Sequence, residues 1–231
     1  MTSRKQMKYD FTYVILTKYL EDDGMKLYII RHGQTDWNLA RKLQGCTDIP
    51  LNEHGRYVAE LTREGLKDVP FDVAFTSPLS RAKETAEIIL KDRNIPIIEE
   101  ERVIEVNFGD YEGKDFRLGD ENLQNFFSRP ELYHPVNGSE SMEQITRRTG
   151  AFLSELFANP KYQDSTILIA THGAALSGLL CNIKNWPVAD FWKGGLHKNC
   201  GFSIVEVKDG VPKILEEAIV AYDEAELAKK I

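Results

Sequence analysis

Two short apolar runs constrain the fold of this chain more than any other feature, because each runs into a histidine-glycine pair. The first run, residues 26–30, is followed after one residue by His32 and a glycine. The second run, residues 166–170, is followed after one residue by His172 and Gly173. Apolar runs of this length are typical of buried strands. The carboxyl ends of such strands form the edge at which open α/β sheets build their sites. We therefore expect both histidines at one edge of a sheet, facing a common pocket.

The rest of the chain alternates between strand and helix signals and contains no internal repeat. Strands are predicted at 26–30, 72–76, 95–99, 166–170, 202–207 and 213–219, and helices at about 52–67, 78–92, 140–158 and 173–184. Alternation of this kind indicates an α/β fold with a mainly parallel sheet that helices cover on both faces.

Local capping signals sharpen the helix predictions. Asn52 is expected to cap the helix that follows it, and Ser77 with Pro78 is expected to supply the N-cap and the first residue of the next helix. That start places Arg81 in the first helical turn, and His172 likewise falls where a strand gives way to a helix. Because a helix N-terminus favours anions, both side chains are expected beside an anion site.

Composition fits one enzyme-sized domain. The 231 residues are 42% apolar, which is enough to bury a substantial core. The net charge is −7 and the basic residues are dispersed, so neither nucleic acid nor a membrane is an expected partner. Any attraction for an anion must therefore be local. The three cysteines are odd in number and form no Cys-x-x-Cys pair, which favours a reducing, cytoplasmic setting.

Residues 1–24 are expected to form an N-terminal extension, either a peripheral strand or helix or a disordered segment. The stretch 9–20 has a basic lead-in and apolar residues, but Asp10 and Lys18 interrupt it and no small-residue cleavage site follows. We therefore expect neither a signal peptide nor a transmembrane helix there. Residues 25–231 are predicted to form a single domain.

Four motifs follow one another along the chain. They read Arg-His-Gly-Gln-Thr-Asp-Trp-Asn at 31–38, Thr-Ser-Pro-Leu-Ser-Arg-Ala at 76–82, Glu-Val-Asn-Phe-Gly-Asp-Tyr-Glu-Gly at 105–113, and Thr-His-Gly at 171–173. In this order they resemble the motifs of the histidine phosphatase superfamily, the phosphoglycerate mutase-like proteins. The resemblance covers roughly residues 25 to 220. It implies a three-layer α/β/α sandwich with a mainly parallel central sheet.

The residue types in these motifs suit the transfer of a phosphoryl group. A phosphomonoester carries up to two negative charges, so its transfer needs cations around the non-bridging oxygens, an in-line nucleophile and a proton for the departing alkoxide. Arg31 and Arg81 offer planar charged forks, and His172 can add a third donor. The resemblance implies that His32 is the nucleophile, which forms a phosphohistidine, and that Glu105 is the proton donor.

Further residues are candidates for binding the substrate, namely Asn38, Thr35 and Gly173. Asn38 matches a phosphate-pocket position of the family and would add an amide donor, although the alternative is that it only caps a turn. Other acidic residues lie close to Glu105, and the alternative proton donors are Glu112 and Glu140.

No metal and no other cofactor is expected. The chain lacks His-x-His, His-Glu-x-x-His and Cys/His clusters, and the two arginines would repel a divalent cation from the same pocket. The remaining histidines, His54, His134 and His197, match no motif and are expected to be surface or packing residues.

Residues of about 106–139 are predicted to form a cap segment over the pocket. Their larger side chains are a mixture of aromatic and basic ones, of which one or two are expected to touch the substrate: Tyr111, Lys114, Phe116, Arg117, Phe126, Phe127, Arg129 and Tyr133. Cofactor-dependent phosphoglycerate mutases, which the chain resembles, carry a longer insertion in this interval. That insertion holds the substrate carboxylate and keeps water away from phosphohistidine. The shorter cap therefore favours hydrolysis.

The sequence thus predicts a metal-independent phosphomonoester hydrolase of the histidine acid phosphatase type, acting on a small phosphorylated metabolite as a cytoplasmic monomer or homodimer. Two alternatives stay open: a cofactor-dependent phosphoglycerate mutase, and a binding module that keeps the anion pocket without turnover. Glu105 separates the enzyme from the binding module, because a binder has no use for a proton donor. The natural substrate does not follow from the sequence pattern.

Overall fold

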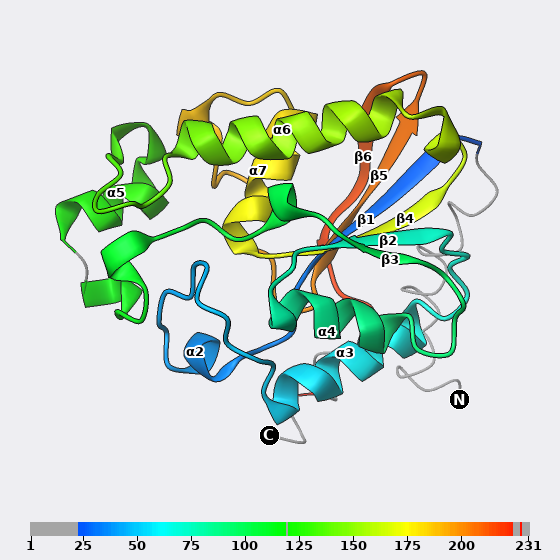
Figure 1. Cartoon of the computed structure of the whole chain (residues 1–231), viewed down its shortest axis with the longest axis horizontal. Coiled ribbons are helices and arrows are strands. Elements are labelled where there is room, and N and C mark those ends of the chain that lie inside the picture. The colour runs from blue at the N-terminus through cyan, green and yellow to red at the C-terminus, as the bar shows by residue number, and fades with distance from the viewer. Residues whose placement is uncertain (1–22, 119, 224–226, 228–231) are drawn as a thin grey trace, which may run out of the picture.

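The computed structural model describes residues 23–118, 120–223 and 227. Their centre is one six-stranded sheet in the order β3-β2-β4-β1-β5-β6 (Figure 1). The strands are β1 Met25–Arg31, β2 Val73–Thr76, β3 Ile97–Glu99, β4 Thr166–Thr171, β5 Phe202–Lys208 and β6 Val211–Ile219. No helix in the described ranges is long and apolar enough to cross a membrane. The expected N-terminal extension lies outside these ranges over residues 1–22.

The sheet is mainly parallel, as the alternation of strands and helices predicted. The strands β3, β2, β4 and β1 pair in parallel, whereas β5 pairs antiparallel with both β1 and β6. The antiparallel pairing of β5 with β6 follows from their short connection, because only Asp209 and Gly210 separate the two strands. Both have positive φ, at 53° and 75°, which suits a two-residue hairpin turn.

The register of β1 against β4 brings the two histidine-glycine pairs together. Arg31 lies opposite Thr171, so His32 and His172 leave the same edge of the sheet from neighbouring strands. Both strands are buried along nearly their whole length. Burial on both faces explains why each reads in the sequence as a continuous apolar run.

Helices cover both faces of the sheet and complete the predicted three-layer α/β/α sandwich (Figure 1). One face carries α3 Glu53–Gly65 and α4 Ser80–Ile89, and the other carries α6 Met142–Ala158 and α7 Gly173–Ile183. Asn52 caps α3 as predicted, since its side chain accepts a hydrogen bond from Gly55 N at 2.8 Å.

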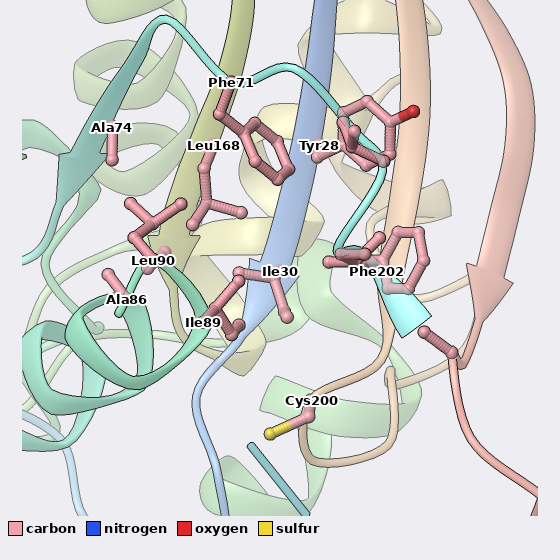
Figure 2. Close-up of a cluster of buried hydrophobic side chains, with 14 of the residues drawn as sticks. Tyr28, Ile30, Phe71, Ala74, Ala86, Ile89, Leu90, Leu168, Cys200 and Phe202 are labelled. Atoms are coloured by element: carbon pink, nitrogen blue, oxygen red, sulfur yellow. The ribbon is translucent and has the colours of Figure 1, made fainter. Parts of the chain in front are cut away.

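Two apolar cores lie between the sheet and its helices. Figure 2 shows the one beneath α3 and α4, with the labelled side chains Tyr28, Ile30, Phe71, Ala74, Ala86, Ile89, Leu90, Leu168, Cys200 and Phe202. Alternation along β1 divides its side chains between the two cores. Tyr28 and Ile30 enter this core, whereas Leu27 and Ile29 enter the core beneath α6 and α7.

A third apolar cluster lies beneath the predicted cap segment. The segment consists of the short helix α5 Glu121–Ser128 and the 3-10 turns Gly109–Tyr111, Phe116–Leu118 and Pro130–Leu132. Phe126 of α5 is completely buried, and its ring centroid lies 4.9 Å from that of Phe108. Trp192 follows the 3-10 turn Val188–Asp190 and donates from its indole Nε1 to the carbonyl oxygen of Phe126 at 2.6 Å. The cap is therefore fastened to a segment outside its own range.

Some predicted element boundaries were wrong. Helix α4 begins at Ser80 with Leu79 as its N-cap, rather than at Pro78, although Arg81 still lies in the first turn. Ser77 lies two residues before this N-cap, and its hydroxyl accepts hydrogen bonds from Leu79 N at 3.3 Å and from Nε2 of His172 at 2.7 Å. Strand β3 begins at Ile97 because Pro96 has no N–H to donate to a neighbouring strand.

The sequence patterns also missed several short elements. Besides α5 and the turns of the cap, these are α2 Asp36–Leu39 and the 3-10 turns Glu101–Val103, Pro160–Tyr162 and Val188–Asp190. One or two turns are too short for an apolar periodicity to develop, so only capping residues could have indicated them.

Candidate active site

A cavity of about 450 Å³ opens at the carboxyl ends of β1 and β4. Arg31, His32, Arg81 and Glu105 all line it, although three separate sequence motifs supply them. The ring of His172 lies next to that of His32, with 5.1 Å between their centroids. The sheet register therefore gathers the five residues predicted as catalytic at one edge of the sheet.

His32 is almost completely buried and held in one orientation. Its Nδ1 lies 2.6 Å from the carbonyl oxygen of Gly33. A carbonyl oxygen only accepts, so Nδ1 carries the proton and Nε2 of the neutral ring keeps its lone pair. Burial, and then the positive charges of Arg81 and Arg31, lower the pKa of His32 well below its ordinary value. The ring is therefore neutral at neutral pH, with an unprotonated nitrogen available as a nucleophile.

Arg31, the last residue of β1, has a donor without a partner. Its Nη1 donates to the carbonyl oxygen of His197 at 2.6 Å, whereas its buried Nε has no hydrogen-bond partner among the described residues. An unpaired buried donor is unfavourable, and an anion in the cavity would satisfy it. Burial lowers the pKa of Arg31 and the charge of Glu105 opposes that effect.

Arg81 is completely buried. Its Nη2 and Nη1 donate to the carbonyl oxygens of Gly45 at 2.7 Å and Thr47 at 2.9 Å, and its Nε donates to Nδ1 of His172 at 3.1 Å. A guanidinium has five N–H groups, so about two remain for a ligand. Burial lowers the pKa of Arg81, opposed first by the charge of Glu105.

His172 holds Arg81 in place. It is the N-cap residue of α7 and is completely buried. Because Nδ1 accepts from Arg81, the proton of the neutral ring lies on Nε2, which donates to the hydroxyl of Ser77 at 2.7 Å. Burial, followed by the charge of Arg81, lowers the pKa of His172 well below its ordinary value. Both ring nitrogens are engaged, so in this arrangement His172 affects the cavity through Arg81.

Glu105 meets the N-terminus of α7. Its Oε1 accepts from the backbone N–H groups of Val106 at 3.0 Å, Ala174 at 3.0 Å and Ala175 at 3.1 Å. Its Oε2 receives only a longer bond of 3.3 Å from Ala174 N. With three donors fixed on Oε1, Oε2 is the oxygen that can carry a proton into the cavity.

The two candidates from the first motif differ in their position. Thr35 is completely buried and caps α2, whereas Asn38 lines the cavity. Oδ1 of Asn38 accepts from Thr35 N at 3.1 Å, and Asn199 Nδ2 donates to His32 O at 3.0 Å and to the same Oδ1 at 3.4 Å. Because Oδ1 is occupied, the amide nitrogen of Asn38 is the group left for a ligand. Thr35 thus supports Asn38 from behind the cavity.

Gly173 is the first residue of α7 and also lines the cavity. A Cβ atom at this position would lie 2.8 Å from Leu196 Cδ1 and 3.6 Å from Oε2 of Glu105. A side chain there would displace Leu196, so glycine allows Leu196 and Glu105 to lie close together.

The alternative proton donors have other partners. Glu112 accepts from Cys46 N at 2.8 Å, from Thr47 N at 2.9 Å and from the hydroxyl of Thr47, and it also accepts from Phe108 N at 3.2 Å. Glu140 receives two hydrogen bonds from Arg148, at 2.6 Å and 3.0 Å. Neither carboxylate lines the cavity, which leaves Glu105 as the acidic side chain that does.

Sequence reasoning missed Asn199, Leu196, and the supporting roles of Ser77 and Glu112. The last two lie within motifs and could have been singled out there, whereas nothing around Asn199 signals its contact with the site. His197 is buried, with Nε2 2.7 Å from Ser203 Oγ, which agrees with the expected packing role. The described residues contain no group of three or more His, Cys, Asp or Glu side chains that could hold a metal ion.

The comparison with protein families decides the identity of this arrangement. The model of the histidine phosphatase superfamily, branch 1, matches residues 27–219. The chain belongs to the histidine phosphatase superfamily. The four motifs quoted above lie inside the matched range, so the resemblance seen in the sequence is confirmed.

Individual relatives include both phosphatases and mutases. The uncharacterized phosphatase PhoE of Bacillus subtilis is 41% identical over 156 residues, 68% of this chain and 76% of the relative. An adenosylcobalamin/alpha-ribazole phosphatase of Salmonella typhimurium is 31% identical over 190 residues, 80% of this chain and 92% of the relative. A 2,3-bisphosphoglycerate-dependent phosphoglycerate mutase of Gloeobacter violaceus is 31% identical over 167 residues, 69% and 75% of the two chains.

Solved structures share the fold. Bacillus stearothermophilus YhfR superposes with a TM-score of 0.79 and 34% identity, covering 84% of this chain and 97% of that one. The phosphoglycerate mutase-like fold predicted from the sequence is therefore confirmed. Together with the higher identity to the phosphatase of B. subtilis, this similarity supports a phosphatase of the superfamily.

Proposed function

We propose that the chain hydrolyses phosphomonoesters of small metabolites through a phosphohistidine on His32. In the first step Nε2 of His32 attacks phosphorus, the bond from phosphorus to the alcohol oxygen breaks, and Glu105 gives its proton to that oxygen. In the second step water attacks phosphorus, the bond from phosphorus to Nε2 of His32 breaks, and Glu105, now ionised, takes a proton from the water. Inorganic phosphate leaves, and both side chains return to their starting states.

The proposal rests above all on one observation, a neutral His32 of fixed tautomer that lies in the field of two guanidinium groups, that of the buried Arg81 and that of the half-buried Arg31. Arg31 offers its unpartnered Nε, and Arg81 keeps about two N–H groups for a ligand. These donors would stabilise the charge that gathers on the phosphoryl oxygens during transfer. Asn38 and Gly173 would complete the phosphate pocket, and His172 would act by holding Arg81.

Metal independence is part of the proposal. Two arginines already supply the positive charge for which other phosphatases use divalent cations, and they would repel such a cation from the cavity. The acid phosphatase type and the absence of a cofactor follow from the same reasoning.

Hydrolysis rather than mutase chemistry is supported by the cap. The cap arginines are engaged outside the cavity, since Arg117 pairs with Asp115 and Arg129 lies 3.6 Å from Glu121. The cap residues that line the cavity are all phenylalanines. Among the described residues the cap thus places no cation in the cavity for the carboxylate of a phosphoglycerate, and the lining cations Arg41 and Lys42 lie outside the cap. A monomer or homodimer and a cytoplasmic location stay predictions.

Hydrolysis of a panel of phosphorylated metabolites, with phosphoglycerate mutase activity measured alongside, tests the proposal. We expect release of inorganic phosphate and no interconversion of 2- and 3-phosphoglycerate. Interconversion faster than phosphate release would favour the mutase. Binding of phosphate without hydrolysis of any ester would favour the binding module.

A further inference from the structure

The cavity is lined by two sets of side chains of different chemistry. One set, formed by Arg31, Arg81, His32, Asn38 and Glu105, suits a phosphoryl group. The other set is apolar, is termed the apolar wall, and consists of Leu43, Phe108, Phe116, Phe126, Phe127, Trp192 and Leu196. When the phosphoryl group is held beside His32, the alcohol part of the ester contacts the apolar wall. The wall therefore bears on the substrate class.

The apolar wall is preformed. The ring centroid of Phe127 lies 4.9 Å from that of Phe126 and 5.9 Å from that of Trp192. Trp192 is fixed in turn by its hydrogen bond to the carbonyl oxygen of Phe126. Rings that pack against one another in the free protein lose little side-chain entropy when a ligand binds.

Two members of the wall are exposed although they are large and apolar. Phe116 is 39% exposed and Leu196 is 54% exposed, and both border the cavity. Leu196 also packs over Gly173, beside Oε2 of Glu105. It therefore lies where the departing oxygen would receive its proton. Apolar side chains exposed around a pocket indicate a ligand surface.

The charges around the cavity disfavour an amino alcohol as leaving group. Glu105 is the one acidic side chain among the described residues that line the cavity, and the proposed mechanism uses it. The other charged lining residues are cations, including Arg41 and Lys42 at the rim. An ammonium group would meet repulsion there, and a hydroxyl group placed against the apolar wall would face phenyl rings that offer no hydrogen-bond partner.

We propose that this chain selects phosphomonoesters of apolar, ring-bearing alcohols over those of polyols and amino alcohols, an inference that rests on the proposed function. Suitable probes are 2-phenylethyl phosphate, glycerol 3-phosphate and O-phosphoserine, because all three leave as alkoxides that need a proton. We expect kcat/KM for the phenylethyl ester to exceed that for the other two by about 10- to 100-fold. Burying apolar surface equal to a few methylene groups stabilises a bound substrate by about this factor.

Matched variants locate the effect. Leu196→Ser and Phe116→Ser should each lower kcat/KM for the phenylethyl ester about 10-fold more than they lower kcat/KM for glycerol 3-phosphate. Leu132→Ser is the control, since Leu132 is 42% exposed on the same cap but does not line the cavity. Both variants change exposed side chains, so the fold should persist.

Equal kcat/KM values for the three esters, or equal losses on all of them in the two variants, would overturn the substrate class while leaving the hydrolase intact. If none of the esters were hydrolysed, the proposed function would fall. The apolar wall would then still be tested by displacement of bound phosphate. Tighter binding of 2-phenylethylphosphonate than of methylphosphonate would support it, and equal binding would refute it.

A separate set of contacts points to a positioning residue for Arg81. The carbonyl groups that hold its guanidinium belong to Gly45 and Thr47, in the loop that follows α2. Glu112 accepts the N–H groups of Cys46 and Thr47 and the hydroxyl of Thr47, so one carboxylate from the cap fixes this loop. A Cβ on Gly45 would lie 1.9 Å from Oε1 of Glu112, which shows how closely the two are packed.

We infer that Glu112 positions Arg81 for the phosphoryl group without touching it. In Glu112→Gln an amide nitrogen replaces one carboxylate oxygen and cannot accept the hydrogen bonds that this oxygen receives from the loop. The loop, and Arg81 with it, should therefore shift. Affinity for vanadate, a phosphate analogue, should fall about 10-fold along with kcat/KM. The control is Glu131→Gln, an exposed carboxylate on the same cap.

A double-mutant cycle separates positioning from general stability. If Glu112 acts through Arg81, Glu112→Gln should weaken vanadate binding much less in an Arg81→Lys background than in the unmodified chain. Equal effects in both backgrounds would overturn the inference. So would unchanged vanadate affinity in the single variant.

Discussion

Replacing Glu105 with glutamine tests the proposed proton donor with little disturbance of its setting. The glutamine carbonyl can take the place of Oε1, which accepts three backbone N–H groups from Val106, Ala174 and Ala175. The amide nitrogen would then occupy the position of Oε2, where only one long bond of 3.3 Å is lost. Binding of the phosphoryl group should therefore persist while proton transfer stops.

The expected size of the effect depends on the leaving group. For an alkyl phosphate, loss of general acid catalysis should lower kcat/KM by about 10²- to 10⁴-fold. At about 1.4 kcal/mol per tenfold change, that corresponds to roughly 3–6 kcal/mol of transition-state stabilisation. For p-nitrophenyl phosphate, whose leaving group departs without a proton, we expect a loss of less than about 10-fold.

The assay compares kcat/KM, because this constant reports the step that forms phosphohistidine. Its later hydrolysis also uses Glu105, so Glu105→Gln should release a burst of p-nitrophenol followed by slow turnover. The control is Glu101→Gln, which changes an exposed acidic side chain four residues before Glu105. This variant should behave like the unmodified chain. Equal losses of kcat/KM on both substrates would refute the acid role.

Three further results are expected. Activity should survive exhaustive chelation, and a loss restored by added Mg²⁺ or Zn²⁺ would contradict the charge balance of the site. The free energy of unfolding should fall as pH drops below about 6.5, because His32, His172 and His197 have lowered pKa values in the folded chain, that of His197 about 4. Each contributes up to about 1.4 kcal/mol per pH unit until it titrates, and a flat urea-denaturation series from pH 7 to pH 5 would exclude this. Asn199→Ala should lower kcat/KM about 10-fold, and much less in an Asn38→Ala background, whereas additive losses would show that Asn199 does not act through Asn38.

The sequence predicted the sheet and its main helices because their signals are long and periodic. The runs that became β1 and β4 are buried on both faces, and α6 and α7 carry sustained apolar stripes. The short helix α5 has one apolar face over two turns and was missed. Its fold depends on packing beneath the cap, where Phe126 meets Trp192 from a distant part of the chain.

The residues of the candidate site that lie in sequence motifs could be predicted. Arg31, His32, Arg81 and Glu105 were identified, and all four line the cavity. Most of the contacts that orient them were not, because they join residues far apart in the sequence through backbone N–H and carbonyl groups. Arg81, for example, is held by the carbonyl oxygens of Gly45 and Thr47, and no pattern of side chains in the sequence predicts these contacts.

Rapid quenching of the reaction with a ³²P-labelled ester tests the phosphohistidine most directly. We predict protein-bound phosphate that is labile in acid and stable in alkali, located by mass spectrometry on the peptide that contains His32. A folded His32→Ala variant should carry no label and release no phosphate. Near-normal hydrolysis by that variant, or label on His172 instead, would contradict the mechanism.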